Sequence, residues 1–366
     1  MRTPIQIVVI RDRGDRRTDV YVDTLRLAFE GSAGGVGSPS AYLSEAVDLG
    51  IRVLEPAKEL GKADVGRLAG GARHTIVVVI GASSNRSKMF EGSVGTDHMV
   101  WVAEPPPMSG GEIQDDKAAD GVEPAFAPVV ATLRVMQRAR RVLLGWIGGC
   151  ECADGGLKLF ISHAKLDGVA MAKSLIGVLR QLREADGDPS GFAYFYDDEH
   201  IAPGSMWSEV LKAEAGQSML IALRTEAYEG RYWCRREFLR AESCGMPILI
   251  VDLRREQYHD CSLLPFDVAP SVRVHDGNLI RVVLHAMAVH LRALRVQSEA
   301  PRGVKVLPHR PSVYSLGGVC QLADSNQTIA YPGPRLPDTY TRAVRPILER
   351  GASTVDLVTF DELAGV

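Results

Sequence analysis

Two short segments combine residue types that suit a site for a transition state carrying positive charge. Trp233 and Glu237 are four residues apart, so a helix would place the indole and the carboxylate on one face. A carboxylate held there can stabilise positive charge as it develops on a substrate, and an aromatic neighbour can exclude water. Earlier in the chain, the apolar run 157–161 ends in Ser162 and His163, as a strand does where it opens onto a ligand crevice.

Each of these residues also has an ordinary structural explanation. A glutamate on an amphipathic helix is usually a solvated charge, and a tryptophan one turn away usually belongs to the core. Ser162 and His163 would ordinarily mark the end of a strand, and the acidic stretch 197–199 a polar loop. Their combination in a fixed order is what indicates a site.

Alternating strand and helix patterns surround these segments, which indicates a parallel sheet with helices between its strands. Apolar β-branched runs predict the strands, and apolar residues at helical spacing predict the helices. The expected strands are 157–162, 192–196, 218–223, 247–251 and 272–274, and the expected helices are 169–182, 206–214, 232–244 and 278–296. Glu237 is therefore expected in the first half of the third helix.

The order of these motifs resembles that of a TIR domain of the bacterial kind, over about residues 156–296. Three motifs carry the resemblance: the strand end Phe160-Ile161-Ser162-His163, the loop 198–204 followed by Trp207, and Trp233-Cys234 with Glu237 three residues after the cysteine. The resemblance implies a flavodoxin-like parallel sheet for this part of the chain.

By the same resemblance, catalytically active members cleave the bond between nicotinamide and ribose in NAD+, and need a glutamate at the position of Glu237. The pyridinium is already a good leaving group, and the transition state resembles an oxocarbenium ion. NAD+ is then a substrate, and no cofactor is implied. The resemblance assigns the substrate pocket to Phe160, Ser162, His163, Asp198, Trp207 and Trp233. Ser162-His163-Ala164 departs from the Ser-Tyr of many relatives, which leaves the identity of a base open.

Residues 1–150 and 297–366 have no counterpart in a minimal TIR domain. In the first region, strands are expected at 5–10, 51–54, 75–80 and 99–103, and helices at 20–29, 64–72 and 129–146, with a Pro/Gly-rich linker at 105–121. This N-terminal α/β domain is either a degenerate TIR-like copy or a sensor with a regulatory role. The C-terminal α/β extension should be extended at 302–311, a strand or turn at 328–334, helical at 339–349 and a strand at 355–360.

The composition narrows the functional classes. With 42 Lys and Arg against 45 Asp and Glu, the chain lacks the basic excess of nucleic-acid-binding domains. Six cysteines without paired spacing indicate reduced thiols, and His163 and His200 lack the spacing of metal ligands. No signal-peptide pattern and no membrane-spanning run is found, so we expect a cytoplasmic protein with neither a nucleic-acid nor a membrane partner.

Three functional hypotheses follow. The first is an NAD+ glycohydrolase or an ADP-ribosyl cyclase, which differ in whether water or an adenine nitrogen captures the ribosyl cation. By resemblance, an upstream activator in antiphage defence would trigger TIR–TIR assembly into a homo-oligomer or filament. NAD+ would then fall, or a cyclic ADP-ribose messenger would reach an effector protein.

The second hypothesis is a non-catalytic TIR adaptor that acts through assembly alone. The pair of Trp233 and Glu237 argues against it, since a scaffold needs no carboxylate in a pocket. The third hypothesis places the function in the flanking regions, for example in a nucleotide-sensing α/β domain. No glycine-rich fingerprint marks such a domain.

Overall fold

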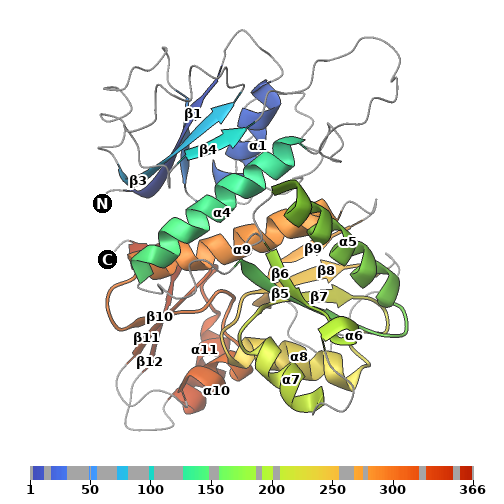
Figure 1. Cartoon of the computed structure of the whole chain (residues 1–366). Coiled ribbons are helices and arrows are strands. Elements are labelled where there is room, and N and C mark those ends of the chain that lie inside the picture. Colours follow the sequence, from blue (N-terminus) through green and yellow to red (C-terminus); the bar gives the residue numbers. More distant parts are fainter. Residues whose placement is uncertain are drawn as a thin grey trace. The chain divides into compact units, whose positions relative to one another are not determined.

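The computed structural model of the protein describes residues 3–11, 18–30, 49, 51–55, 72–80, 99–102, 127–147, 156–186, 192–200, 207–254, 268–274, 279–320, 327–348 and 355–364. The chain divides into two compact units (Figure 1). One consists of residues 1–150 with 181–188, and the other of residues 151–180 with 189–366. Both are α/β, and all strand pairs formed by the described residues are parallel, as the alternating sequence pattern predicts.

The first unit contains a four-stranded parallel sheet with the order β2-β1-β3-β4. Its strands are β1 (Thr3–Ile10), β2 (Arg52–Leu54), β3 (Ala72–Ile80) and β4 (Met99–Val102), and its helices are α1 (Asp19–Glu30) and α4 (Ala127–Ile147). Unbroken apolar runs such as Val77–Ile80 make the central strands buried on both faces. The two helices pack against each other, and each also contacts the sheet.

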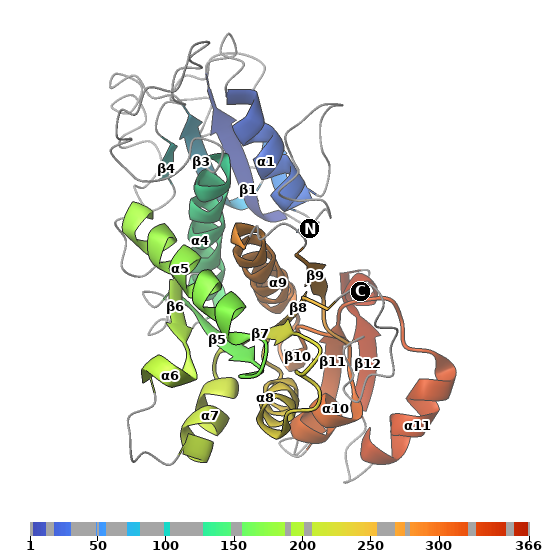
Figure 2. The same ribbon diagram turned by 90° about the vertical axis from the view of Figure 1, so that its right-hand side faces the viewer.

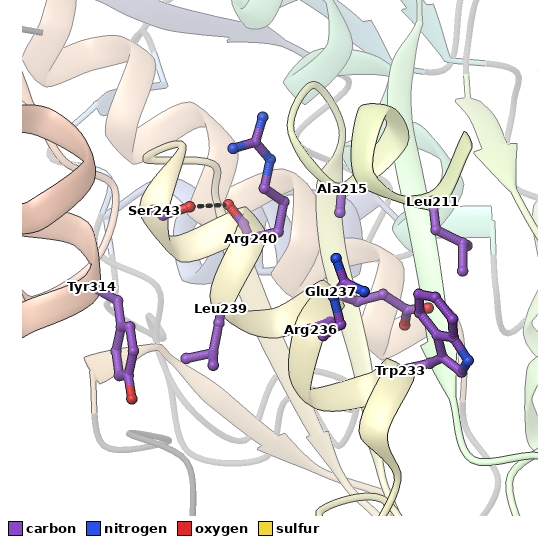
Figure 3. A pocket seen from close by; sticks show the side chains of 9 residues that line it. All are labelled: Leu211, Ala215, Trp233, Arg236, Glu237, Leu239, Arg240, Ser243 and Tyr314. Carbon is purple, nitrogen blue, oxygen red and sulfur yellow. Dashed lines mark hydrogen bonds between the residues drawn. The ribbon is translucent and has the colours of Figure 1, made fainter. Parts of the chain in front are cut away.

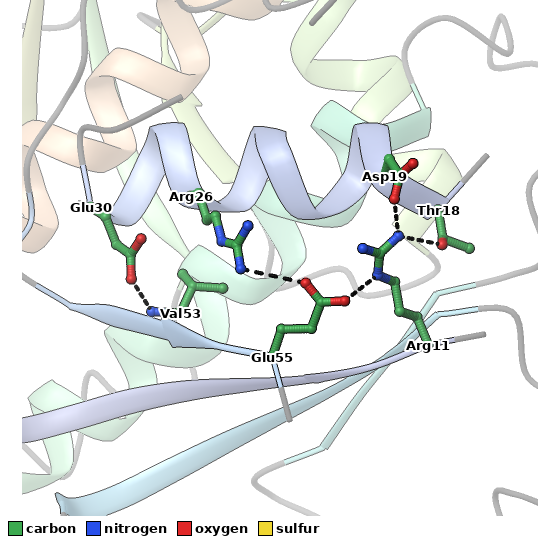
Figure 4. A network of polar contacts seen from close by, with 7 residues as sticks. All are labelled: Arg11, Thr18, Asp19, Arg26, Glu30, Val53 and Glu55. Carbon is green, nitrogen blue, oxygen red and sulfur yellow. Dashed lines mark hydrogen bonds and ion pairs between the residues drawn. The ribbon is translucent and has the colours of Figure 1, made fainter. Parts of the chain in front are cut away.

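An ion network closes the carboxyl edge of this sheet at β1 and β2 (Figure 4). Arg11, which follows β1, donates from Nε to Glu55 Oε1 at 2.8 Å and from Nη1 to Thr18 Oγ1 at 2.9 Å, and also pairs with Asp19. Arg26 of α1 reaches the other oxygen of Glu55 at 3.4 Å. Asp19 lies in the first turn of α1, the place where a dinucleotide-binding domain holds a phosphate. The protein's own negative charge therefore lies at this helix terminus.

We expect Arg11 and Glu55 to depend on each other, so that removing one partner alone destabilises the first unit. Each side chain keeps only 12% of its exposure, so Arg11→Met leaves a largely buried carboxylate short of its main partner. The free energy of unfolding should fall by about 3 kcal/mol, and the double variant with Glu55→Met should recover most of that loss. Hydrogen exchange of the β1 and β3 amides measures both; a double variant no more stable than Arg11→Met would contradict this.

The second unit contains a five-stranded parallel sheet with the order β6-β5-β7-β8-β9. Its strands are β5 (Leu157–His163), β6 (Phe192–Phe195), β7 (Met219–Arg224), β8 (Ile248–Asp252) and β9 (Ser271–Arg273). Its helices are α5 (Val169–Asp186, of which residues 181–186 are counted with the first unit), α6 (Asp197–His200), α7 (Trp207–Ala215), α8 (Tyr232–Ser243) and α9 (Ile280–Glu299). Helices α7 and α8 cover one face of the sheet, and α5 and α9 cover the other (Figures 1 and 2).

The chain leaves β5 for β6 on one side and then returns to β7 on the other. Such a reversal makes a topological switch point between the carboxyl ends of β5 and β7, where open α/β sheets bind their ligands. The first four strands of both sheets follow the same spatial order, β2-β1-β3-β4 in one and β6-β5-β7-β8 in the other. The sequence patterns indicate a similar succession of strands and helices in the two halves. The strand pairing shows that the spatial order of four strands is the same in both sheets.

The C-terminal residues form a smaller α/β layer within the second unit. Strands β10 (Val304–Val306), β11 (Gln327–Tyr331) and β12 (Val355–Thr359) make a parallel sheet in that order, with helices α10 (Val313–Cys320), α11 (Asp338–Leu348) and α12 (Phe360–Ala364). Its core includes Leu316 of α10, Tyr331 of β11 and Val344 of α11. Helix α10 packs against α8, so this layer touches the helix that carries Glu237.

All strands and helices expected for residues 156–296 are present, with ends within four residues of those expected. Of the expected helix 64–72, residues 64–71 lie outside the described residues and Ala72 begins β3, and the linker 105–121 also lies outside them. Helices α6, α10 and α12 were not expected, and Gly317 and Gly318 explain the omission of α10, since glycine weakens a helix.

Within the described part of the chain, Cys234 and Cys244 are free thiols. The described helices include none with the length and apolar character needed to cross a membrane.

Candidate functional site

Glu237 lies at the switch point, hydrogen-bonded to the end of β5. Ser162 Oγ donates to Glu237 Oε2 at 2.6 Å. Ser162 Oγ also lies 2.7 Å from the hydroxyl oxygen of Tyr228. Because Ser162 has one proton to give, Tyr228 is the donor of the second bond. The chain of bonds runs from Tyr228 through Ser162 to Glu237, and joins the turn after β7, strand β5 and helix α8.

The carboxyl of Glu237 is neutral over much of the physiological range. Although the residue keeps part of its surface exposed, burial raises the pKa of this carboxyl to about 8. The hydrogen bond from Ser162 lowers the pKa, and the negative charge of Asp197 raises it further. No ion pair joins Glu237 to any cation among the described residues. An empty site therefore keeps the proton, and an incoming cation would favour its loss.

Two buried neighbours of Glu237 remain neutral donors. Tyr228 is fully buried, and burial holds the pKa of its phenol well above the usual value. Burial likewise raises the pKa of the Cys234 thiol to about 12, with a further contribution from Glu237. The Cys234 Sγ donates to the carbonyl oxygen of His163 at 3.3 Å. Cys234 is therefore a structural donor that ties α8 to β5, since a nucleophilic cysteine needs a lowered pKa.

Two loops at the switch point are held together by Asp167. Its carboxylate accepts from Thr225 Oγ1 at 2.7 Å and from the backbone N–H of Ala227 at 3.0 Å. The turn that carries Asp167 is followed by Gly168. Glycine suits this position, because a Cβ there would lie 3.0 Å from the carbonyl oxygen of Ala164. This link fixes the turn that precedes Tyr228, and so sets the position of its hydroxyl.

The structure brings together Glu237, Ser162 and Trp233 among the residues expected in the site. Trp233 is half-buried and lines a pocket with Glu237, and its indole packs edge-on against Tyr232 at 5.3 Å. The guanidinium of Arg236 lies 5.2 Å from the centre of the same indole, in a cation–π contact. The indole beside the carboxyl therefore contacts both an aromatic ring and a guanidinium.

Phe160 and His163 do not have the places expected of them. Phe160 is buried in the core and packs against Phe195 at 5.2 Å between ring centres, which leaves no ring face for a ligand. The ring of His163 is stacked on Tyr196 at 5.2 Å, and does not line the pocket of Glu237.

The other two expected residues, Asp198 and Trp207, belong to helices that the structure describes. Asp198 lies in α6, and Trp207 is the first residue of α7. Their side chains lie outside the described residues, so their part in the pocket stays a prediction.

The pocket beside Glu237 has a volume of about 320 Å³ and lies between α7, α8 and α10 (Figure 3). Its walls are mostly carbon, and two arginines of α8 also face it. The lining residues are Leu211, Ala215, Trp233, Arg236, Glu237, Leu239, Arg240, Ser243 and Tyr314. Sequence reasoning did not assign Tyr228 to the site, and the structure places its hydroxyl on Ser162. Sequence reasoning also missed Arg236, Arg240 and Tyr314, and no sequence signal pointed to Tyr314 because α10 itself was not expected.

The chain was compared with models of known protein families and with curated proteins. No model of a known protein family matches the chain, and no curated protein matches it. Among the described residues, no group of three or more His, Cys, Asp or Glu side chains could hold a metal ion. The described groups at the site are one carboxyl, two hydroxyls in series and an aromatic wall with a guanidinium.

Proposed function

We propose that this chain is a TIR-domain enzyme that cleaves the bond between nicotinamide and ribose in NAD+, as a glycohydrolase or an ADP-ribosyl cyclase. The observation that carries the proposal is the hydrogen bond of 2.6 Å between Ser162 and Glu237. The two residues are 75 positions apart, both belong to the TIR motifs, and they meet at the switch point of the sheet. The strand order supports a flavodoxin-like TIR domain, since flavodoxin-like sheets have the order 2-1-3-4-5.

In the proposed reaction, the bond between the pyridinium nitrogen and the ribose C1′ breaks, and its electron pair leaves with nicotinamide. Positive charge then develops on the ribose, and the Glu237 carboxylate stabilises it. Ser162 and Tyr228 orient that carboxylate through their hydrogen bonds. Water captures the cation and loses a proton in the hydrolase, whereas an adenine nitrogen captures it in the cyclase.

The raised pKa of Glu237 fits a cationic substrate. NAD+ carries a positive charge on its pyridinium, and a cation beside a carboxyl lowers the pKa of that carboxyl. The free site would thus hold a neutral acid, and the occupied site a carboxylate. In the empty site a permanent carboxylate would be buried beside Asp197, which also carries negative charge.

This proposal predicts a pH profile. Because kcat/KM reports the ionisation of free enzyme, it should rise about tenfold per pH unit below pH 8 and level off above it. The profile of kcat should level off at a lower pH, since the bound pyridinium favours the carboxylate. Initial rates of nicotinamide release between pH 5.5 and 9 measure both profiles. A kcat/KM that stays constant between pH 6 and 8 would contradict the role given to Glu237.

The direct test is nicotinamide release from NAD+ by the purified full chain, with and without a crowding agent that promotes assembly. Chromatography of the second product separates ADP-ribose from a cyclic form, and so separates hydrolase from cyclase. Release that is absent under all these conditions would overturn the enzymatic proposal.

A second candidate, a TIR adaptor that acts by assembly, is favoured by exposed apolar side chains. Leu166 in the loop after β5 is 71% exposed, and Tyr232 at the start of α8 is 57% exposed. Both lie near the carboxyl edge of the sheet, where they offer contacts to a second copy of the chain. Light scattering that shows assembly of a chain inert toward NAD+ would support this candidate over the enzyme.

A further inference from the structure

The pocket of Glu237 continues along α8 toward the C-terminal layer. Glu237 and Ser243 both line it, and six residues of helix span about 9 Å. Tyr314, which belongs to α10, lines the far end near Leu239, as Figure 3 shows. A ribose and its nicotinamide at Glu237 would thus leave a stretch of groove for the rest of a longer ligand.

The middle of this groove carries positive charge. Arg236 and Arg240 line it, and Glu237 is the one acidic residue among the described lining residues. Arg236 donates to the Tyr232 hydroxyl at 3.1 Å and lies against two aromatic rings. Arg240 is exposed, and no carboxylate in the described part of the chain pairs with it. A pyrophosphate is complementary to such a pair of guanidinium groups.

The far end of the groove suits a flat base. Tyr314 is 46% exposed although it is a large aromatic residue, and the side chain of Leu239 lies beside it (Figure 3). An exposed tyrosine next to apolar walls can stack on a purine. The hydroxyl of Ser312 accepts a hydrogen bond from the backbone N–H of Tyr314 at 3.0 Å. Ser312 therefore caps the start of α10, where Tyr314 lies.

We infer that this groove holds the adenylate end of the dinucleotide, with Arg240 at the pyrophosphate and Tyr314 of the C-terminal layer against the adenine. The inference rests on the proposed cleavage of NAD+ and adds the residues that select a dinucleotide over a shorter nicotinamide compound. A pocket of 320 Å³ is within the range of small-molecule sites, which is roughly 300–1,000 Å³. The C-terminal layer, which a minimal TIR domain lacks, thereby completes the substrate site.

The test compares NAD+ with nicotinamide riboside, which lacks both the pyrophosphate and the adenine. Tyr314→Ala and Arg240→Gln should each raise the KM for NAD+ about tenfold, with kcat within about twofold of the parent chain. The rate with nicotinamide riboside should not change in either variant. Val313→Ala and Arg235→Gln are matched controls, because they lie on the same two helices and do not line the pocket.

A binding measurement separates this inference from the proposed reaction. Calorimetry of ADP with the full chain should show binding that Tyr314→Ala and Arg240→Gln each weaken about tenfold. A chain that binds ADP in this way and releases no nicotinamide would retain the groove and lose the proposed function. An active chain whose KM for NAD+ and affinity for ADP are unaltered in both variants would overturn the groove alone.

Discussion

Replacing Glu237 with glutamine should lower the release of nicotinamide from NAD+ about a thousandfold while the chain stays folded. Glutamine has the shape of glutamate and its oxygen can still accept the hydrogen bond from Ser162. It has no negative charge to stabilise the ribosyl cation. The comparison of initial rates is sharpest at about pH 9, since most of the Glu237 carboxyl of the parent chain is ionised above its pKa of about 8 even in the empty site.

The same substitution should stabilise the protein above neutral pH. A folded pKa of about 8 against an ordinary value of 4.5 means that the folded state binds the extra proton between these values, so the free energy of unfolding falls as the pH rises. Glutamine removes this dependence. Glu237→Gln should therefore be more stable than the parent by about 4 kcal/mol at pH 8, with little difference near pH 4.5. Urea unfolding at the two pH values measures it.

Glu209→Gln is the control for both effects, because Glu209 is an exposed residue of α7 that does not line the pocket. It should change neither the rate nor the pH dependence of stability. Full activity of Glu237→Gln would show that the carboxylate is not catalytic. A stability difference of equal size at the two pH values would show that the carboxyl is not held as a neutral acid.

Gly318→Ala should separate α10 from α8 and cost about 3 kcal/mol of stability. A Cβ at Gly318 would lie 2.0 Å from the carbonyl oxygen of Ser243 and 2.9 Å from its carbonyl carbon. These are backbone atoms of α8, so no side chain can move aside to make room. Because α10 carries Tyr314, its displacement should also raise the KM for NAD+. Thermal unfolding and steady-state kinetics measure the two effects.

Gly317→Ala provides a matched control one residue away. A Cβ at Gly317 meets no atom within 4 Å, so alanine adds helix propensity without a clash and should stabilise the protein by about 1 kcal/mol. The two neighbouring substitutions should thus act in opposite directions. If both destabilise the protein equally, the close contact between α10 and Ser243 is not what requires glycine at position 318.

Most strands and helices could be predicted from local sequence patterns. Two helices that were not predicted, α10 and α12, have capping residues that the sequence contains. The β-branched runs and helical spacings locate the elements, but the strand order depends on the side to which each crossover turns. Helix α10 was hidden by its two glycines, although Ser312 and Ser315 exchange the backbone hydrogen bonds of a helix cap. Helix α12 has a capping box of Thr359 and Glu362, which the sequence displays.

Within the candidate site, the alternation of a strand explains which expectations failed. Ser162 and Phe160 share one face of β5, but Phe160 lies about 7 Å deeper from the edge, beneath the helices. His163 points to the opposite face, where it meets Tyr196. The meeting of Glu237 with Ser162 followed from the TIR motifs. The presence of Tyr314 in the pocket could not, since it depends on how a distant layer packs.

The two larger sheets repeat one strand order and treat electric charge at their carboxyl edges in different ways. At the first edge, the guanidinium of Arg11 is already matched by Glu55 and Asp19, and an arriving ion would have to break those pairs. At the second, an acid waits with hydroxyl partners and no counter-ion among the described residues. The two sheets therefore share one strand order, but only at the second edge could a cation bind without displacing an ion pair of the described residues.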